Sequence, residues 1–457
     1  MRRFTMILGA TAALLSGLSL APARAQECGP LRLIADVKML TSRNITRPWV
    51  PVAIKGAPKL FLLDTGVYIS QLSQYSVKEL QMEKRDSALR LFDVSGNESR
   101  NFVIAESLKL GSLTASRQPL MVSPGGDSLD GILATDLMLR YDVDIDFRAN
   151  SLKYFSPDHC PGKVVYWAPP AVAAVPITIK DKFHIMVSVK LDGHDFNALL
   201  DTGATRTTMS RDVAKRVFGL EPESPGMTKL GIVNDDPKLV SYGYQFKTLS
   251  FNGVDVNNLR TSIIPDRMNS GSRETQTESR ARSVMADFKL PELILGMDVL
   301  RHLHVYMAFK EKTLYVSAGS EPPKQEDFLA WLDHALTLSP NNAWLLNNRC
   351  FVRGLKKTFL EEALQDCASA LKIRPQASHI MDSKAFVLYQ LGRHQEAMET
   401  YNQVLAIDPQ SAASLFMRGH TRKSLGDAAG GNTDIAAAKT IDADVFSTFE
   451  GSGVSAN

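Results

Sequence analysis

The stretch FLLDTG at residues 61–66 decides the fold, because the chain repeats it as ALLDTG at residues 198–203. In each copy an apolar run, typical of a buried strand, ends in an aspartate that is followed by a threonine and a glycine. A carboxylate that ends a buried strand is poorly placed for solubility. Asp64 and Asp201 would form an acid–base pair if the two segments folded against each other.

The similarity between the two halves extends beyond this motif. Residues 131–137 (GILATDL) correspond to residues 293–299 (LILGMDV), and we expect one strand to follow in each half, over Tyr141–Tyr154 and His304–Val316. Short apolar runs separated by glycine, proline, asparagine and aspartate are typical of strands and turns, and Asp192-Gly193 predicts a hairpin turn. The sequence therefore predicts an internal duplication of a β-rich unit.

Residues 1–25 have the pattern of a secretory signal peptide, with two arginines, an apolar stretch and Ala-Arg-Ala before Gln26. We favour its removal over an uncleaved N-terminal anchor, because the apolar stretch is short and is interrupted by serine and glycine. Export across the inner membrane of a Gram-negative bacterium predicts a periplasmic or secreted protein. No second apolar run reaches membrane-spanning length, so we expect no membrane span after removal of the signal.

The charge of the chain argues against nucleic-acid or anionic-membrane partners. The formal net charge of +3 equals the number of arginines in residues 1–25, which hold no acidic residue, so the mature chain is neutral overall.

The four cysteines form two pairs in the sequence. Cys28 and Cys160 bracket the first half, and a disulfide between them, which export would permit, stays open at this point. For Cys350 and Cys367 in the C-terminal region we favour buried thiols over a disulfide. Cysteine and histidine spacings resemble no metal site, so we expect neither a metal nor another cofactor.

The C-terminal region carries a helical repeat. Short signatures at residues 338–340, 373–375, 407–409 and 441–443 recur at intervals of 35, 34 and 34, and small residues recur in phase with them. A period of 34 residues resembles the tetratricopeptide repeat, whose units are helix pairs. We count three repeats after a half-repeat helix over Asp327–Leu338, with an unrelated helical bundle as the alternative.

The two β-rich halves also resemble a family. Both copies of the motif follow Leu-Leu and precede Ile-Leu-(Ala/Gly)-x-Asp, and this combination resembles the retroviral-type (retropepsin-like) aspartic proteases and their bacterial exported relatives over about residues 48–318. The resemblance implies a multidomain chain with two β-rich acid-protease-like lobes, a pepsin-like pseudo-dimer, followed by an α-helical tetratricopeptide-type solenoid. We place the boundaries at 1–25 (signal peptide), 26–165 and 166–318 (the two β domains), 319–325 (linker), 326–446 (repeats) and 447–457 (tail).

The resemblance assigns roles to residues of this chain. Asp64 and Asp201 would be the catalytic pair, which activates a water between the two carboxyl groups with no metal and no covalent intermediate. The supporting residues of the two loops would be the threonines, which hydrogen-bond to the opposite loop, and the glycines, which let the loops approach: Thr65, Gly66, Thr202 and Gly203.

Further roles concern the surroundings of the pair. Ala134 and Gly296 would lie on strands beneath the catalytic loops, and we interpret Asp136 and Asp298 as helix N-caps or ion-pair partners. The candidate flap over an extended polypeptide substrate is the turn around Gly96. A second flap candidate spans residues 231–244, and the polar insert at residues 267–282 is expected to form a mobile surface loop.

The first motif departs from the family where the second conforms. Val67 and Tyr68 replace the small residues expected there, and Ala134 replaces a glycine. A bulky Tyr68 would narrow the cleft, tune specificity or mark a weakened site.

Two functions follow from these patterns. The first is an exported aspartic endopeptidase that uses Asp64 and Asp201, with the repeats recruiting a substrate or another protein partner on their concave face. The alternative is a catalytically inert protease-like scaffold whose main role is protein binding through the repeats. Carboxylates that lay far apart would exclude a peptidase formed within one chain and leave a homodimer as the catalytic option.

Overall fold

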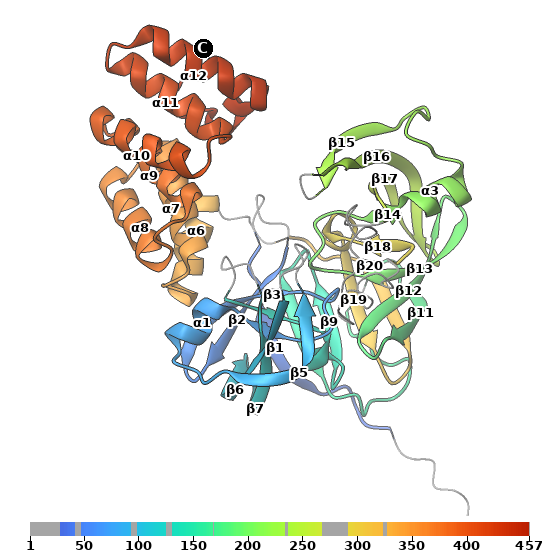
Figure 1. Ribbon diagram of the computed structural model, residues 1–457. Coiled ribbons are helices and arrows are strands. Elements are labelled where there is room, and N and C mark those ends of the chain that lie inside the picture. The colour runs from blue at the N-terminus through green and yellow to red at the C-terminus, as the bar shows by residue number, and fades with distance from the viewer. Residues whose placement is uncertain are drawn as a thin grey trace, which may run out of the picture.

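The computed structural model describes residues 28–41, 47–92, 98–124, 130–167, 169–233, 236–266, 291–322 and 327–456 (Figure 1). The predicted signal peptide, the candidate flap residue Gly96 and the polar insert at 267–282 lie outside the described residues, as do residues 323–326 of the predicted linker region.

The first lobe is a sheet that closes on itself. Within the described residues its strands run in the order β2-β3-β8-β4-β7-β6-β5, and β2 also pairs with β6. The parallel pairing of β3 with β8 brings the strand that ends at Leu63 beside Leu133. The elements are β2 (Trp49–Ile54), β3 (Ala57–Leu63), β4 (Gln71–Leu72), α1 (Gln74–Glu79), β5 (Arg85–Phe92), β6 (Glu98–Leu110), β7 (Leu113–Val122), β8 (Gly131–Leu133) and α2 (Thr135–Met138).

The second lobe repeats this topology strand for strand. Its order is β12-β13-β18-β14-β17-β16-β15, again with an added pairing that closes the sheet, between β12 and β16. The predicted duplication and the hairpin at Asp192-Gly193, where both residues have positive φ, are therefore confirmed. The elements are β12 (His184–Leu191), β13 (His194–Leu200), β14 (Thr208–Ser210), α3 (Arg211–Phe218), β15 (Thr228–Val233), β16 (Asp236–Phe251), β17 (Val254–Ile264), β18 (Leu293–Leu295) and α5 (Met297–Leu300).

Six further strands join the lobes through one antiparallel array, β1-β10-β9-β19-β20-β11. At its centre β9 of the first half pairs with β19 of the second, with Ile145 opposite Val305. The expectation of one strand after each Ile-Leu motif was wrong, because a turn divides each stretch into a hairpin, with Asn150 and Lys312 in the left-handed region. The strands are β1 (Leu33–Lys38), β9 (Asp142–Asp146), β10 (Ser151–Phe155), β11 (Ala173–Lys180), β19 (Leu303–Ala308) and β20 (Thr313–Ala318).

Both cysteine pairs form disulfides. The bridge between Cys28 and Cys160 ties the residues before β1 to the link between the two halves. Our preference for buried thiols at Cys350 and Cys367 was wrong, because the two residues face each other on two consecutive helices, α7 (Ala343–Lys356) and α8 (Leu360–Ile373), and are bridged.

The C-terminal region consists of helix pairs, as the repeat period predicts. α6 (Phe328–Leu338) is the half-repeat helix, and the three pairs after it rise away from the lobes in orange to red in Figure 1. The pairs are α7 (Ala343–Lys356) with α8 (Leu360–Ile373), α9 (Ser378–Gln390) with α10 (His394–Ile407), and α11 (Ala412–Ser424) with α12 (Ala428–Ile441), followed by the 3-10 helix η1 (Val445–Phe449).

The first lobe and the solenoid share a buried interface. Trp49 of β2 stacks on Trp344 of α7 with ring centroids 5.6 Å apart, and its ring also meets Trp331 of α6 edge-on at 6.4 Å. These rings belong to one apolar cluster with residues of both parts. The burial of these three indole rings between the two parts stabilises the contact of the solenoid with the first lobe.

Asp130 adds a polar anchor at the same interface. Its carboxylate is 1% exposed and accepts hydrogen bonds from Ser339 Oγ, from Asn342 Nδ2 at 3.2 Å and from the Leu60 backbone N–H at 2.8 Å. Burial raises the pKa of Asp130, and the nearby Lys59 opposes this rise. Leu60 lies on β3 and Asp130 directly precedes β8, so the solenoid is anchored to the two strands that lead to the first motif.

We predict that Asp130→Ala loosens the solenoid from the first lobe. The substitution leaves three buried donors without an acceptor, at a cost of about 1–3 kcal/mol for each unsatisfied group. Calorimetry is expected to show a separate, earlier transition for the repeats. The control Asp158→Ala removes an exposed carboxylate that pairs with Lys310 and should leave the melting profile unchanged. One wild-type transition in Asp130→Ala would contradict the prediction.

Candidate active site

The two Asp-Thr-Gly loops meet where β3 and β13 end. In each lobe the aspartate N–H donates to the neighbouring Ile-Leu strand, Asp64 to Leu133 O and Asp201 to Leu295 O, both at 3.0 Å. The parallel pairings of β3 with β8 and of β13 with β18 set this position. Equivalent strands therefore deliver both aspartates to the interface between the lobes.

The two threonines bind the opposite loops reciprocally. Thr65 Oγ1 donates to Leu200 O at 2.6 Å and accepts from the Thr202 N–H at 3.0 Å. Thr202 Oγ1 donates to Leu63 O at 2.7 Å and accepts from the Thr65 N–H at 3.1 Å. Both threonines are fully buried, so these four hydrogen bonds satisfy groups that water cannot reach.

The two glycines bring each loop against the opposite carboxyl group. A Cβ atom at Gly66 would overlap the carboxyl group of Asp201, and a Cβ at Gly203 would overlap that of Asp64. Any side chain at either position would push the loops apart. The close approach that glycine permits therefore places Asp64 and Asp201 beside each other across the interface.

The two carboxyl groups differ in their surroundings. The carboxyl group of Asp64 accepts from the N–H groups of Gly66, at 3.0 Å to Oδ1, and Val67, and Asp201 Oδ1 accepts from those of Gly203 at 2.9 Å and Ala204 at 3.0 Å, but Asp64 is the more deeply buried of the two. Burial, together with the charge of Asp201, raises the pKa of Asp64 to about 7. Burial also raises the pKa of Asp201, against the backbone hydrogen bonds that favour its carboxylate. Because burial and mutual repulsion disfavour two ionised carboxyl groups side by side, the pair retains a proton below about pH 7.

Such a pair can act as an acid and a base at once. The ionised carboxylate can accept a proton from a water, and the protonated one can donate to an oxygen of a bound molecule. Among the described residues, no group of three or more His, Cys, Asp or Glu is arranged to hold a metal ion.

A second layer of hydrogen bonds holds the chain after each motif. Asp136 Oδ1 accepts from the N–H and hydroxyl of Ser70 at 3.0 and 2.6 Å, and Asp298 Oδ1 accepts from those of Thr207 at 2.8 and 2.7 Å. The interpretation of Asp136 and Asp298 as N-caps was wrong, because Ala134 and Gly296 occupy the N-cap positions of α2 and α5.

Ser70 and Thr207 were missed from the sequence, although each follows its catalytic-type aspartate by six residues. Their hydroxyls also accept from the backbone N–H groups of Ala134 at 3.0 Å and Gly296 at 3.1 Å. The equal spacing in both halves was the signal that could have identified them.

Ala134 and Gly296 lie at equivalent positions of the two lobes, but only the first position has room for a side chain. A Cβ at Gly296 would overlap the backbone between Arg206 and Thr207, so glycine is required there. Ala134 is fully buried in the first lobe, where the chain accommodates its methyl group.

Tyr68 links the first motif to the other lobe. Its ring lies 5.9 Å from the ring of Phe183, which sits in the turn between β11 and β12. Burial raises the pKa of Tyr68, so the phenol stays neutral. The bulky residue that departs from the family pattern therefore packs across the lobe interface.

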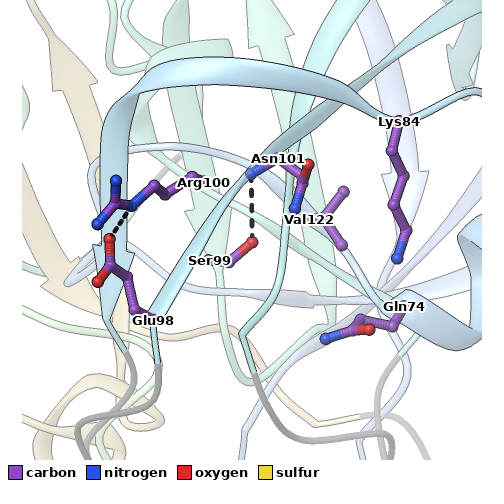
Figure 2. A pocket seen from close by; sticks show the side chains of 7 residues that line it. All are labelled: Gln74, Lys84, Glu98, Ser99, Arg100, Asn101 and Val122. Atoms are coloured by element: carbon purple, nitrogen blue, oxygen red, sulfur yellow. Dashed lines mark hydrogen bonds and ion pairs between the residues drawn. The ribbon is translucent and has the colours of Figure 1, made fainter.

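Paired strands border the first flap candidate and run through the second, while Gly96 itself lies outside the described residues. β5 pairs with β6 on both sides of the stretch that contains Gly96, and β15 pairs with β16 around the second candidate. A polar cavity of about 380 Å³ lies beside the first hairpin and is lined by residues of β6, β7 and α1 and by Lys84 (Figure 2). Its lining residues are Gln74, Lys84, Glu98, Ser99, Arg100, Asn101 and Val122.

Comparisons with known families agree with this geometry. Residues 50–137 and 187–299 match the aspartyl protease family, one segment in each lobe, and residues 387–426 match the TPR repeat. The chain is a duplicated aspartyl-protease-type region joined to tetratricopeptide-type repeats. The family resemblance of the sequence is thus confirmed. No curated protein matches the chain significantly.

We predict that Thr65→Val destabilises the protein and disturbs the pair. Valine keeps the shape of threonine but leaves Leu200 O and the Thr202 N–H without a partner, at a cost of about 1–3 kcal/mol for each buried group. Urea unfolding measures the loss. Thr65→Ser keeps the hydroxyl and should lose much less, and equal losses in the two variants would contradict the role of the hydroxyl.

We predict that Asp64→Asn stabilises the fold at pH 8 and not at pH 4. The pKa of Asp64 is about 7 in the folded protein against an ordinary value of 3.8, so its contribution to stability is full below about pH 4 and is lost as pH rises through 7. Asparagine avoids the cost of the buried charge, on the order of a few kcal/mol. Melting temperatures at both pH values test this, and a variant that melts below wild type at pH 8 would contradict it.

Proposed function

We propose that this protein is an exported aspartic endopeptidase that hydrolyses peptide bonds with a water activated between Asp64 and Asp201. The observation that carries the proposal is the reciprocal bonding of Thr65 and Thr202, which holds the two aspartate loops in contact within one chain. The condition for a peptidase formed within one chain, that the two loops pack together, is met.

The two carboxyl groups would divide the chemistry. Asp201, whose carboxylate accepts two backbone hydrogen bonds, takes a proton from the water as it attacks the peptide carbonyl carbon. Asp64, which holds the proton, donates it to the carbonyl oxygen. Asp201 then passes the proton it took to the nitrogen, the C–N bond breaks to release the amine, and Asp64 takes back a proton from a hydroxyl of the intermediate as the new carboxyl group forms.

The substrate in this proposal is an extended polypeptide held between the lobes and the flap hairpins. The solenoid would recruit a protein or peptide partner. Export to the periplasm or the exterior is supported by the signal-peptide pattern of residues 1–25 and by the two disulfides. Within the described residues no helix is long and apolar enough to cross a membrane.

The alternative is an inert scaffold that binds proteins through its repeats. The observation that favours it is the packing of Tyr68 against Phe183, which fills space beside the first motif. The second motif carries Thr205 at the corresponding place. The two functions differ in whether the protein cleaves peptides at all.

We predict that the mature chain cleaves members of a peptide library between pH 3 and 8. Asp64→Asn and Asp201→Asn should each reduce cleavage by at least ~100-fold, because each removes one partner of the acid–base pair. The rate should fall as pH rises through about 7, where Asp64 loses its proton.

Pepstatin-like inhibitors should block the wild-type chain. Asp195→Asn, which removes an exposed surface carboxylate, should leave the rate unchanged. Cleavage that survives either substitution in the pair would refute a shared dyad, and no cleavage by the wild-type chain would favour the scaffold.

A further inference from the structure

The end of the chain is packed into the solenoid. The residues predicted as a C-terminal tail, 447–457, begin within the 3-10 helix η1, whose Phe449 is fully buried. The ring of Phe449 contacts three phenylalanines, with centroid distances of 6.2 Å to Phe351, 5.3 Å to Phe386 and 5.7 Å to Phe416.

The three phenylalanines come from equivalent helices. Phe351 lies on α7, Phe386 on α9 and Phe416 on α11, so each belongs to the first helix of one of the three pairs. In helical solenoids, repeated elements of one kind line an extended concave face that binds partners. Phe449 therefore occupies an aromatic pocket formed by the first helices of all three pairs, a surface built from the same element of each repeat.

A second anchor follows the first. Val454, five residues after Phe449, is 8% exposed, and Ser452 between them is fully buried. Gln390 Nε2 of α9 donates to Ser452 O at 3.1 Å. Gly451 and Gly453 have φ of 80° and 78°, which favours glycine and turns the chain between the two anchors.

The segment has the character of a bound peptide. Its apolar anchors point into the repeats, while Thr448 and Glu450 on either side of Phe449 are exposed. A segment that only capped the last pair would contact α11 and α12, yet Phe449 reaches back to α7. The contacts thus span all three repeats.

We propose that the concave face of the repeats is a peptide-binding site and that residues 445–456 are its resident, displaceable ligand. The partner that competes for it is a polypeptide segment with a phenylalanine anchor, a glycine-containing turn and an aliphatic anchor about five residues later. The inference rests on the recruiting role proposed for the repeats and does not depend on peptidase activity.

A tethered ligand suppresses binding by a free one. Short flexible tethers give effective concentrations in the mM range. A free peptide with an intrinsic Kd of about 10 μM would then bind the intact chain roughly 100-fold more weakly. Only a partner with high affinity or at high concentration can therefore displace the resident segment.

The test uses the mature full-length chain and a fluorescent peptide with the sequence of residues 442–457. Phe449→Asp in the protein should release the segment, because it would bury a charge among three aromatic rings. We expect this variant to bind the peptide at least tenfold more tightly than the wild-type chain does. Thr448→Asp, which adds the same charge at the exposed neighbour, should behave like wild type.

Several outcomes would overturn the proposal. Equal affinity for all three proteins, or no binding to Phe449→Asp, would each do so. A wild-type dimer that Phe449→Asp abolishes would show instead that two copies exchange their ends. A peptide that itself carries the Phe→Asp change should not bind.

A folding defect leaves the test decisive. If Phe449→Asp loses helical circular dichroism, free peptide should restore the signal, and failure to restore it overturns the proposal. A second variant, with residues 445–456 replaced by a Gly/Ser segment of equal length, should bind the peptide as Phe449→Asp does, and no binding to it counts against the proposal. Because binding is the readout, an inactive peptidase site leaves the result unaffected, and the two proposals fail separately.

Discussion

The reciprocal hydrogen bonds of Thr65 and Thr202 are the interaction on which the rest of the structure depends. Two buried carboxyl groups side by side repel each other when both are ionised, so loops that were not held by hydrogen bonds would move apart. Each threonine instead ties its own loop to the end of the strand in the other lobe. The paired strands behind the loops and the antiparallel array that joins the lobes keep this contact rigid.

The duplication surrounds Asp64 and Asp201 with equivalent hydrogen bonds from the two threonines, yet the two carboxyl groups differ in burial. Both aspartates accept hydrogen bonds from following N–H groups, but Asp64 is more deeply buried and has a pKa raised to about 7. The divergence of Val67 and Tyr68 falls on the same side, where Tyr68 meets Phe183 of the other lobe. The first copy of the motif thus differs from the second in the burial of its carboxyl group and in the contact of Tyr68 with Phe183. Both copies keep the same hydrogen bonds between the two loops.

Local motifs predicted much of this structure, because their physical requirements are local. The Asp-Thr-Gly loops, the hairpin at Asp192-Gly193 and the 34-residue helix pairs follow from turn chemistry and periodicity. Features that depend on distant partners could not be predicted. Residues more than ninety positions apart meet in the pairing of β9 with β19, in the contacts of Asp130 with Ser339 and Asn342, and in the contact of Phe449 with Phe351. No periodicity links such residues in the sequence.

The solenoid is anchored on only one of two lobes that otherwise repeat each other. A cleft with true two-fold symmetry presents the same walls to a polypeptide running in either direction. Here Trp49 and Asp130 attach the helices to the first lobe, and the second lobe carries no such attachment within the described residues. The attachment makes the surroundings of the two aspartates unequal on their two sides. Under the proposed function, a polypeptide held by the helices would therefore reach the aspartates in one orientation, with its amino and carboxyl ends in fixed places.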